Sequence, residues 1–425
     1  MQSKRHLIFF RLRFFFPAYS FSGSRWTSML GVCALLSLVC TPCWAGGLYI
    51  TETGLTSQGT AHAGALAYAN DASAAWYNPA GMTRLSGTEI QASAGVLFGQ
   101  VEFEQDPGTP VAGGNGGNAA LPAPILGFSL AHSFTDRLKG GFALGSISGA
   151  GLDYDNSWAG RQQATEVQLI MLTAAPSLAY RLLDWLSVGA QLQISYASLD
   201  PFELRAPNPA QSFIRIDGDT WVFGYSIGAL VEISERTRLG VKYQSETELD
   251  FSGDLNISGG MVGGTSFSTD LTIQLPQAVE VSLYHEINDQ WAVLGTANWE
   301  QWSDFRSIPI STARGSAQIP RGWVDTFKLA GGVHYRLSPL WLLKAGMAYD
   351  SRPVGASQRT ADMPMDRQFR YAVGAQYQYS EALSLGGAFE YIDLGKGEIN
   401  SSQLMGEYDR NDLFFFSFNG NFKFL

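Results

Sequence analysis

Cysteine is almost absent from this chain, and its three cysteines all lie between residues 33 and 43. The surrounding stretch begins with basic residues, continues with a short apolar run and ends with small residues before Gly46, which is typical of a secretory signal peptide. We therefore predict a signal peptide over residues 1–45, with Met1 or Met29 as its start. A single membrane anchor is the alternative, although the apolar run is short for a span. Removal of the signal would leave no cysteine for disulfide or thiolate chemistry.

Charged residues are also scarce, at 16 % of the chain, and acidic residues outnumber basic ones. The predicted signal holds five of the 28 Lys and Arg residues and none of the 38 Asp and Glu residues, so the mature chain is strongly acidic. An acidic exported protein argues against a nucleic-acid partner. After Gly46 no apolar run reaches the roughly 18 residues that a membrane-spanning helix needs.

Signals for catalysis or cofactor binding are missing as well. The four histidines after the signal, His62, His132, His285 and His334, do not have the spacing of a metal site. Residues 224–228 match the Gly-x-Ser-x-Gly pattern of hydrolases, but they lie within a predicted strand and not at the sharp turn that this pattern requires. We expect no metal, no cofactor and no enzymatic activity.

Aromatic residues and glycine are abundant, and they occur in segments that alternate in polarity. From residue 413 to the end, the even-numbered positions are aromatic except for Gly420, whereas Ser417, Asn419, Asn421 and Lys423 share the other face. Five further segments with the same period are 186–196, 221–233, 341–349, 371–379 and 383–391. Strands of this length with aromatic ends are typical of a membrane barrel, with aromatic side chains toward lipid and polar ones toward the lumen.

The connections between these segments have two lengths. Short turns are predicted near residues 135–137, 183–184, 234–236, 288–289, 338–339 and 380–381, and long loops near 105–121, 151–162, 200–212, 253–268, 306–322, 351–366 and 395–410. Six turns and seven loops join fourteen strands, which predicts an all-β fold: a 14-stranded antiparallel transmembrane β-barrel over residues 86–425. An even strand number places both termini on the periplasmic side. A soluble sandwich or propeller is the alternative, but it rarely needs such long strands.

Residues 46–85 do not alternate. They are rich in alanine, which favours short helices, and they contain an Asn-Pro turn signal. A fourteen-stranded barrel is too wide for wall side chains to fill, so we predict that this segment is a plug, or hatch, inside the lumen. A periplasmic tail is the alternative, but such tails are usually more highly charged.

The stretch from Asp71 to Met82, which reads DASAAWYNPAGM, resembles the hatch signature of the FadL/TodX family. Weaker blocks follow in the expected order, among them WEQWSDF at 299–305 and AYDSRPV at 348–354. Members of this family are outer-membrane transporters of long-chain fatty acids and other hydrophobic compounds. The resemblance implies a fourteen-stranded barrel with a hatch in the lumen, in a Gram-negative outer membrane.

The resemblance also implies a set of functional residues. The mature N-terminus, here Gly46, Gly47, Leu48 and Tyr49, would form part of the tighter ligand site, and Asn78, Pro79 and Ala80 would belong to the hatch. A kink in the third strand would let ligand leave sideways through the wall. Our candidate for this strand, residues 140–151, is rich in glycine, which marks bends in strands. Its relevant glycines are Gly140, Gly141, Gly145 and Gly149; tight packing against the plug is the alternative role.

The sequence thus predicts a passive channel that captures a fatty acid, alkane or aromatic hydrocarbon at its outer loops. Expected partners are outer-membrane lipid, lipopolysaccharide and the barrel-assembly machinery, and a monomer is expected. A general diffusion porin is the alternative, but the inward faces appear in the sequence as Gly, Ser and Gln with few charges. Arg321 and Lys328 are interpreted as rim charges, so whether the ligand carries a carboxylate stays open.

Overall fold

The computed structural model describes residues 53–206, 212–259 and 264–424. The predicted signal peptide, residues 1–45, lies outside them. The described strands are β1 (Thr88–Gln105), β2 (Ala123–Ser133), β3 (Leu138–Gly145), β4 (Gly149–Asp153), β5 (Glu166–Leu183), β6 (Leu186–Arg205), β7 (Phe213–Ser234), β8 (Thr237–Gln244), β9 (Thr247–Ser258), β10 (Thr265–Leu275), β11 (Ala278–Glu286), β12 (Trp291–Glu300), β13 (Ser307–Thr312), β14 (Gly315–Pro320), β15 (Thr326–Arg336), β16 (Trp341–Asp350), β17 (Gln368–Gln378), β18 (Leu383–Asp393), β19 (Ile399–Asn400) and β20 (Met405–Phe424).

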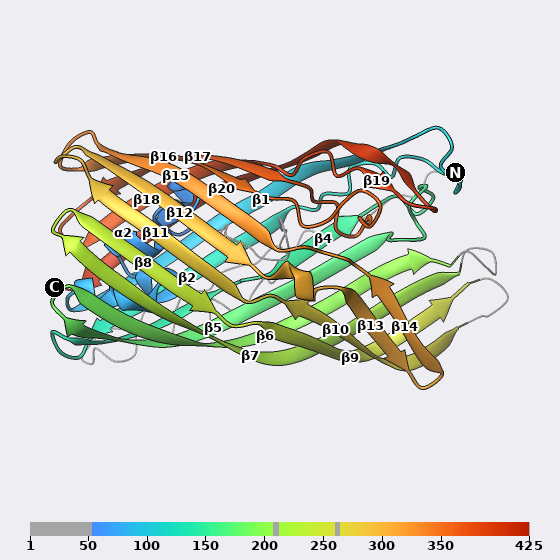
Figure 1. Cartoon of the computed structure of the whole chain (residues 1–425), viewed down its shortest axis with the longest axis horizontal. Helices are drawn as coiled ribbons and strands as arrows, with labels where there is room; N and C mark the ends of the chain where they lie inside the picture. Colours follow the sequence, from blue (N-terminus) through green and yellow to red (C-terminus); the bar gives the residue numbers. More distant parts are fainter. Residues whose placement is uncertain (1–52, 207–211, 260–263, 425) are drawn as a thin grey trace, which may run out of the picture. The chain divides into compact units, whose positions relative to one another are not determined.

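These strands form a closed barrel. β3 with β4, β8 with β9, and β10 with β11 are each two parts of one wall strand, while β13, β14 and β19 belong to loops, so the described wall has fourteen strands. Neighbouring wall strands pair antiparallel, and β1 pairs with β20 from Thr88↔Phe424 to Gln105↔Gly406, which closes the sheet (Figure 1). This pairing removes the two free edges that an open sheet would expose to lipid. The predicted fourteen-stranded barrel is therefore confirmed.

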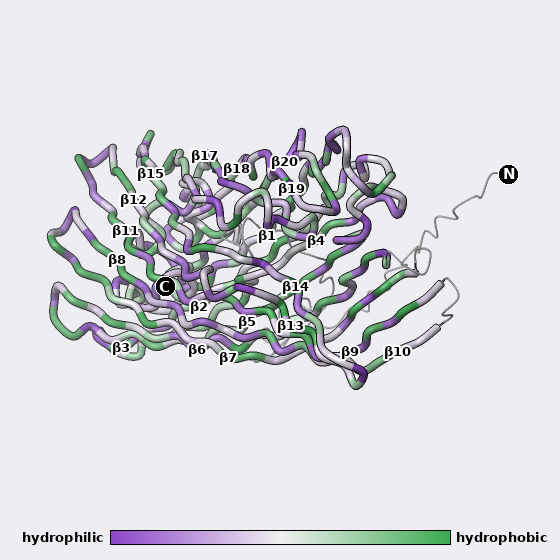
Figure 2. The backbone as a smooth tube through the Cα atoms, turned by 45° about the vertical axis from the view of Figure 1, so that its right-hand side comes forward, coloured by the Kyte–Doolittle hydropathy of each residue, from purple (hydrophilic) through white to green (hydrophobic). Residues whose placement is uncertain are grey.

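The two faces of the wall differ in polarity. In β20, Phe418 is 74 % exposed on the outer face and Ser417 is 1 % exposed on the inner face, as the alternation predicted. Figure 2 shows hydrophobic and hydrophilic positions succeeding one another along the strands. An apolar outer face and a mixed inner face are what a bilayer requires of a barrel wall.

The connections confirm the two-length rhythm, but some predicted loop boundaries are wrong. Residues 200–205, 253–258 and 265–268 were predicted as loop and belong to β6, β9 and β10. They continue to pair, for example at Arg205↔Phe213 between β6 and β7. Their polarity therefore reflects contact with water and not a loss of strand pairing.

Residues 53–85, called the N-terminal segment below, form short helices as their alanine content predicted. They are η1 (Thr56–Thr60), α2 (Ala65–Tyr68), α3 (Ala74–Tyr77) and η2 (Pro79–Arg84). Nearly every residue from Thr53 to Thr83 is buried. No helix among the described residues is both long and apolar enough to cross a membrane.

Candidate functional site in the barrel interior

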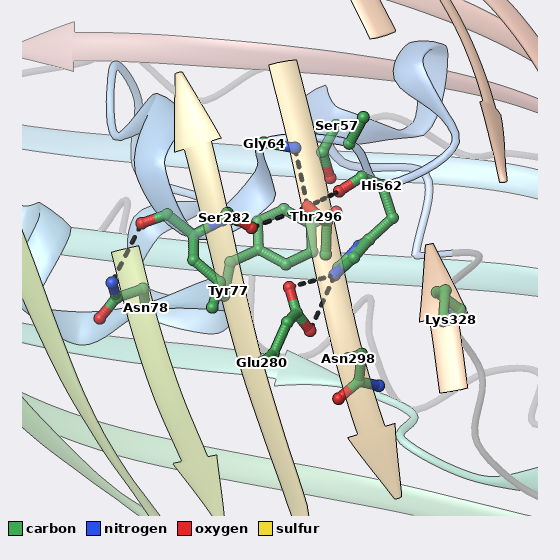
Figure 3. A network of polar contacts seen from close by, with 12 residues as sticks. Ser57, His62, Gly64, Tyr77, Asn78, Glu280, Ser282, Thr296, Asn298 and Lys328 are labelled. Atoms are coloured by element: carbon green, nitrogen blue, oxygen red, sulfur yellow. Dashed lines mark hydrogen bonds and ion pairs between the residues drawn. The ribbon is translucent and has the colours of Figure 1, made fainter. Parts of the chain in front are cut away.

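The N-terminal segment is hydrogen-bonded to strands from around the whole wall. Its wall partners are Gln191 on β6 (to Ala75 O, 2.8 Å), Arg238 on β8 (to Ala67 O, 3.0 Å), Glu280 on β11 (from His62 Nε2, 3.1 Å), Thr296 on β12 (from Gly64 N, 2.9 Å), Lys344 on β16 (to Thr56 O, 3.1 Å) and Asn419 on β20 (to Gly54 O, 3.2 Å). Figure 3 shows the His62, Glu280 and Thr296 contacts from close by. Because these wall side chains sit on the face opposite the lipid-facing aromatics, the segment packs against the inner face.

Asn78 organises the turn between α3 and η2. Its Oδ1 accepts a hydrogen bond from the backbone N–H of Ala80 at 3.2 Å, and Pro79 begins η2, where a missing N–H is tolerated. Its Nδ2 donates to Leu66 O and, on the wall, to Ala229 O, both at 3.0 Å. One side chain therefore joins two helices of the segment to β7.

Inward-facing glycines bring the segment's backbone against the wall. A Cβ atom on Gly240 of β8 would lie 2.3 Å from Leu66 O, and one on Gly346 of β16 would lie 2.1 Å from Thr60 O. Any larger residue there would have to displace the segment, because backbone atoms cannot yield as a flexible side chain can.

We predict that Gly240→Val loosens the segment without damaging the wall. Overpacking of this kind costs about 1–3 kcal/mol, so channel-opening events in a planar bilayer should become about tenfold or more frequent. Gly331→Val on β15 is the matched control, because a Cβ there meets nothing within 4 Å. An equal opening frequency for the two variants would contradict the prediction.

The inner face carries many charges, which corrects the expectation of few. Buried charged residues of the inner face include Glu89, Lys139, Arg238, Glu280, Lys328, Lys344, Arg370 and Glu390. They pair across strands, as Lys328 with Asp350 at 3.7 Å and Arg370 with Asp350 at 2.9 Å. The expectation was wrong because each strand contributes only one or two charges. These charges come together only when the strands pair in register.

Arg321 and Lys328 are not rim charges, which corrects their interpretation from the sequence. Arg321 is 1 % exposed and donates to both carboxylate oxygens of Asp362, and its Nη1 to Asp362 Oδ1 distance is 2.9 Å. Lys328 is 8 % exposed and faces the interior on β15. The sequence places both residues near one predicted strand, but it does not reveal that Asp362, 41 residues further along, pairs with Arg321.

A cavity of about 80 Å³ lies between the N-terminal segment and the wall. Thr53, His62, Trp76 and Tyr77 line it from the segment, and Ile147, Gln191, Gln193, Lys242, Gln244, Ala278, Glu280, Asn298 and Glu300 line it from the wall. Burial raises the pKa of the Tyr77 hydroxyl, so it stays neutral and shares a hydrogen bond with Thr53 Oγ1 at 2.9 Å. Aromatic rings thus meet amides and charges within one cavity, called the interior cavity below.

Toward the long loops the inner face becomes apolar. A pocket there, called the loop pocket below, is lined by Val167, Leu169, Leu199, Phe202, Leu271, Ile273, Ile308, Ile319 and Met363, together with the Arg321–Asp362 pair. A second cavity of about 460 Å³, lined by Phe202, Ile319 and mostly polar loop residues, shares that ion pair. The pocket residues Val167 to Met363 pack in the same hydrophobic cluster as Ile147, Trp76 and Tyr77. Apolar side chains therefore pack in one cluster from the loop pocket to the interior cavity.

The third wall strand is interrupted beside that cavity. It was predicted as one strand over residues 140–151, but β3 ends at Gly145 and β4 begins at Gly149. β3 pairs with β2 as far as Phe128↔Leu144. Among the described residues, β4 has only one bridge to the chain that precedes β2, at Ala120↔Leu152. The interrupting residue Ile147 lines the interior cavity.

The four glycines of this strand have different surroundings. A Cβ on Gly141 would lie 2.4 Å from Met82 Sδ, and one on Gly145 would lie 3.0 Å from the Trp76 ring, so both allow close packing of the segment. A Cβ on Gly140 would instead meet the Phe134 ring at 2.6 Å. Gly149 begins β4, at the end of the interruption.

A comparison with protein families identifies the family of this chain. Residues 36–420 match the family model described as outer membrane protein transport protein (OMPP1/FadL/TodX). The chain belongs to the FadL/TodX family. It is 25 % identical to the long-chain fatty acid transport protein of Escherichia coli K12 over 435 residues, which cover 92 % of this chain and 97 % of that protein. It is also 25 % identical over 415 residues to the 47 kDa outer membrane protein of Pasteurella multocida, covering 89 % and 93 % of the two chains.

Solved structures of FadL/TodX proteins share the fold. A Pseudomonas aeruginosa FadL homologue matches with a TM-score of 0.82 and 22 % identity, over 89 % of this chain and 100 % of that one. The Pseudomonas putida toluene transporter TodX matches with a TM-score of 0.69 and 15 % identity, over 88 % and 99 %. At these identities the likeness establishes the fold and leaves the ligand undefined.

The FadL/TodX signature gave some site residues and missed others. Gly46, Gly47, Leu48 and Tyr49 lie outside the described residues. Asn78, Pro79 and Ala80 lie together in the segment, at 1 % exposure for Asn78 and 0 % for Ala80. Lys242, Gln191 and Glu280 were missed, although the period of two already places Lys242 on the same face as Arg238.

Proposed function

We propose that this FadL/TodX protein is a passive outer-membrane channel for long-chain fatty acids or other hydrophobic compounds, and that it is not an enzyme. The observation that carries the proposal is the continuous cluster of buried apolar side chains, which extends from the loop pocket to Trp76 and Tyr77 and includes Ile147 at the interruption of the wall. The lumen of a water-filled porin is polar and would not need such a cluster. The proposal agrees with the names of two relatives, a long-chain fatty acid transport protein and a toluene transporter.

Partition of the ligand drives the proposed uptake. Lipopolysaccharide is a poor solvent for apolar molecules, and burial in the loop pocket stabilises a ligand by about 0.8 kcal/mol per CH₂ group. The ligand then passes along the apolar cluster to a tighter site beside the N-terminal segment, to which we also assign Gly46–Tyr49. No nucleotide is needed, because the ligand itself shifts the equilibrium between seated and displaced segment.

The N-terminal segment acts as the hatch in this proposal. Its hydrogen bonds to β6, β8, β11, β12, β16 and β20 support a position across the lumen. Displacement of the hatch would release ligand through the gap in the wall between Gly145 and Gly149. Exit into the bilayer spares an apolar molecule the transfer into water.

The proposed orientation places both termini in the periplasm. Thr88, at the start of β1, pairs with Phe424, at the end of β20, on the same edge as the short turns. Short turns are typical of the periplasmic edge of such barrels. We further propose that the protein is a monomer, is inserted by the barrel-assembly machinery and contacts lipopolysaccharide through its outer loops.

Uptake of labelled oleate by cells that lack their own transporter tests the proposed function. Leu271→Asp places a charge in the loop pocket, where Leu271 is 3 % exposed, and should lower uptake by roughly tenfold or more. Leu271→Met keeps the volume and should retain uptake within about twofold. The proposal is wrong if cells expressing the folded wild-type protein take up no oleate, alkane or aromatic hydrocarbon, or if the protein lets small sugars swell liposomes as a general porin does.

A further inference from the structure

The outer face of the wall carries an apolar groove that the proposed transport path does not use. The groove, called the outer groove below, crosses β3, β5, β6, β7 and β8, which pair in this order in the wall (Figure 1). It has a volume of about 630 Å³ and is lined by Leu138, Leu178, Ala179, Tyr180, Val188, Gly189, Ala190, Ile227, Gly228, Ala229, Val241 and Tyr243. None of these side chains is charged, so the outer groove suits an apolar occupant.

The outer groove exists because small side chains stand between large ones. Ala190 on β6 lies opposite Leu178 of β5 and opposite Ile227 of β7. Both neighbours point outward and are more than half exposed, at 58 % and 52 %, so the shared register places Ala190 on the same face. Ala229 on β7 repeats the arrangement between Val188 and Val241. The two alanines therefore form a recess with higher walls.

The same two strands hold the N-terminal segment on their inner face. A Cβ atom on Gly228 would lie 2.2 Å from Asn78 Oδ1, and one on Gly189 would lie 2.5 Å from Ala80 N. The residue after each of these glycines is one of the two outward alanines. The outer groove therefore lies directly across the strand backbone from the seat of the Asn-Pro-Ala element.

The depth of the outer groove in the membrane determines what covers it. Outward positions of β6 are apolar from Leu186 to Tyr196, and Ser198 is the first polar one. Ala190 lies within this apolar stretch, so the groove faces hydrocarbon and not water. It is also continuous with the lipid-facing surface of the wall. Lipid acyl chains are the apolar material that surrounds a barrel at this depth.

We propose that the outer groove binds one acyl chain of a membrane phospholipid. The chain would lie over Ala190 and Ala229, with Leu178 and Ile227 at its sides. A recessed chain has contacts on its sides as well as beneath it, so it gains more dispersion energy than a chain on a flat part of the wall. The protein thus has a lipid partner distinct from the transported ligand, and this lipid packs behind the strands that seat Asn78.

Native mass spectrometry of the purified mature protein, titrated in detergent with palmitoyl-oleoyl phosphatidylethanolamine, tests the assignment. Wild type should bind its first phospholipid about tenfold or more tightly than the double variant Ala190→Leu/Ala229→Leu, whose larger side chains occupy the groove. Ala345→Leu/Ala375→Leu is the matched control. These alanines stand in the same diagonal register on β16 and β17 but do not line the groove, so this variant should bind within about twofold of wild type.

The other possible results would overturn the proposal in different ways. Equal affinity of wild type and the groove variant, or a wild type that retains detergent only, would remove the lipid site. Displacement of the phospholipid by an equal concentration of oleate would assign the groove to the transported ligand. A two-chain mass that wild type shows and the groove variant lacks would assign it to a second copy. Heat-modifiable migration establishes that each variant is folded, and Ala229→Leu alone provides the comparison if the double variant does not fold.

Discussion

A barrel that lacks residues 46–80 is expected to fold and to conduct small ions continuously. The wall closes through β1 and β20, whose pairing begins at Thr88, and no residue of the N-terminal segment contributes a strand. Removal of the segment leaves the wall's backbone hydrogen bonds in place but removes the side-chain contacts to Glu280, Lys344 and Gln191. Those polar groups would then face water, which satisfies them.

The expected change is large because a fourteen-stranded wall encloses more space than its own side chains fill. Single-channel conductance in a planar bilayer should rise by roughly tenfold or more over that of the full-length protein measured in the same preparation. Heat-modifiable migration on a gel reports the fold of both proteins independently. A truncated protein that migrates as a folded barrel and yet stays closed would show that the segment is not a plug.

The wall could be predicted from sequence because one physical demand acts on every strand. Lipid requires an apolar side chain at each second position, so Phe416, Phe418 and Phe422 alone indicate which face of β20 is outside. Turn lengths then give the strand number, since a short turn has few ways to connect antiparallel neighbours. The same logic failed at residues 200–205, because a strand that continues into water loses the alternation but keeps its pairing.

The interior could not be predicted in the same way, because its chemistry arises between strands. Lys242 and Glu280 are 38 residues apart in sequence and directly opposite in the β8–β11 register. Arg321 and Asp362 meet only because the loop after β16 contacts the residue that follows β14. The Asn-Pro-Ala element was found because the chemistry of a cap and a turn is local, and such signals survive in a single sequence.

The interruption of the third strand can be removed by deleting one residue. Gly145 pairs with Thr173 and Gly149 pairs with Ile170, so three residues of this strand oppose two of β5. That one-residue excess is a bulge, which bends a strand and breaks its ladder. Deletion of Ser146 equalises the two sides and should join β3 to β4 in a single register with β5.

If ligand leaves through this part of the wall, the variant lacking Ser146 should bind oleate normally but transport it roughly tenfold or more slowly. Slower hydrogen exchange of the amides from 144 to 152 would show that the ladder has closed. Ser146→Ala is the matched control: it loses the hydroxyl bonds to Ser148 O at 2.8 Å and Met171 O at 2.5 Å but keeps the extra residue. Its transport should stay within about twofold of wild type, since each of these two hydrogen bonds contributes only about 1 kcal/mol to stability and the bulge is kept. Undiminished transport through a closed ladder would instead place the exit within the lumen, beneath the N-terminal segment.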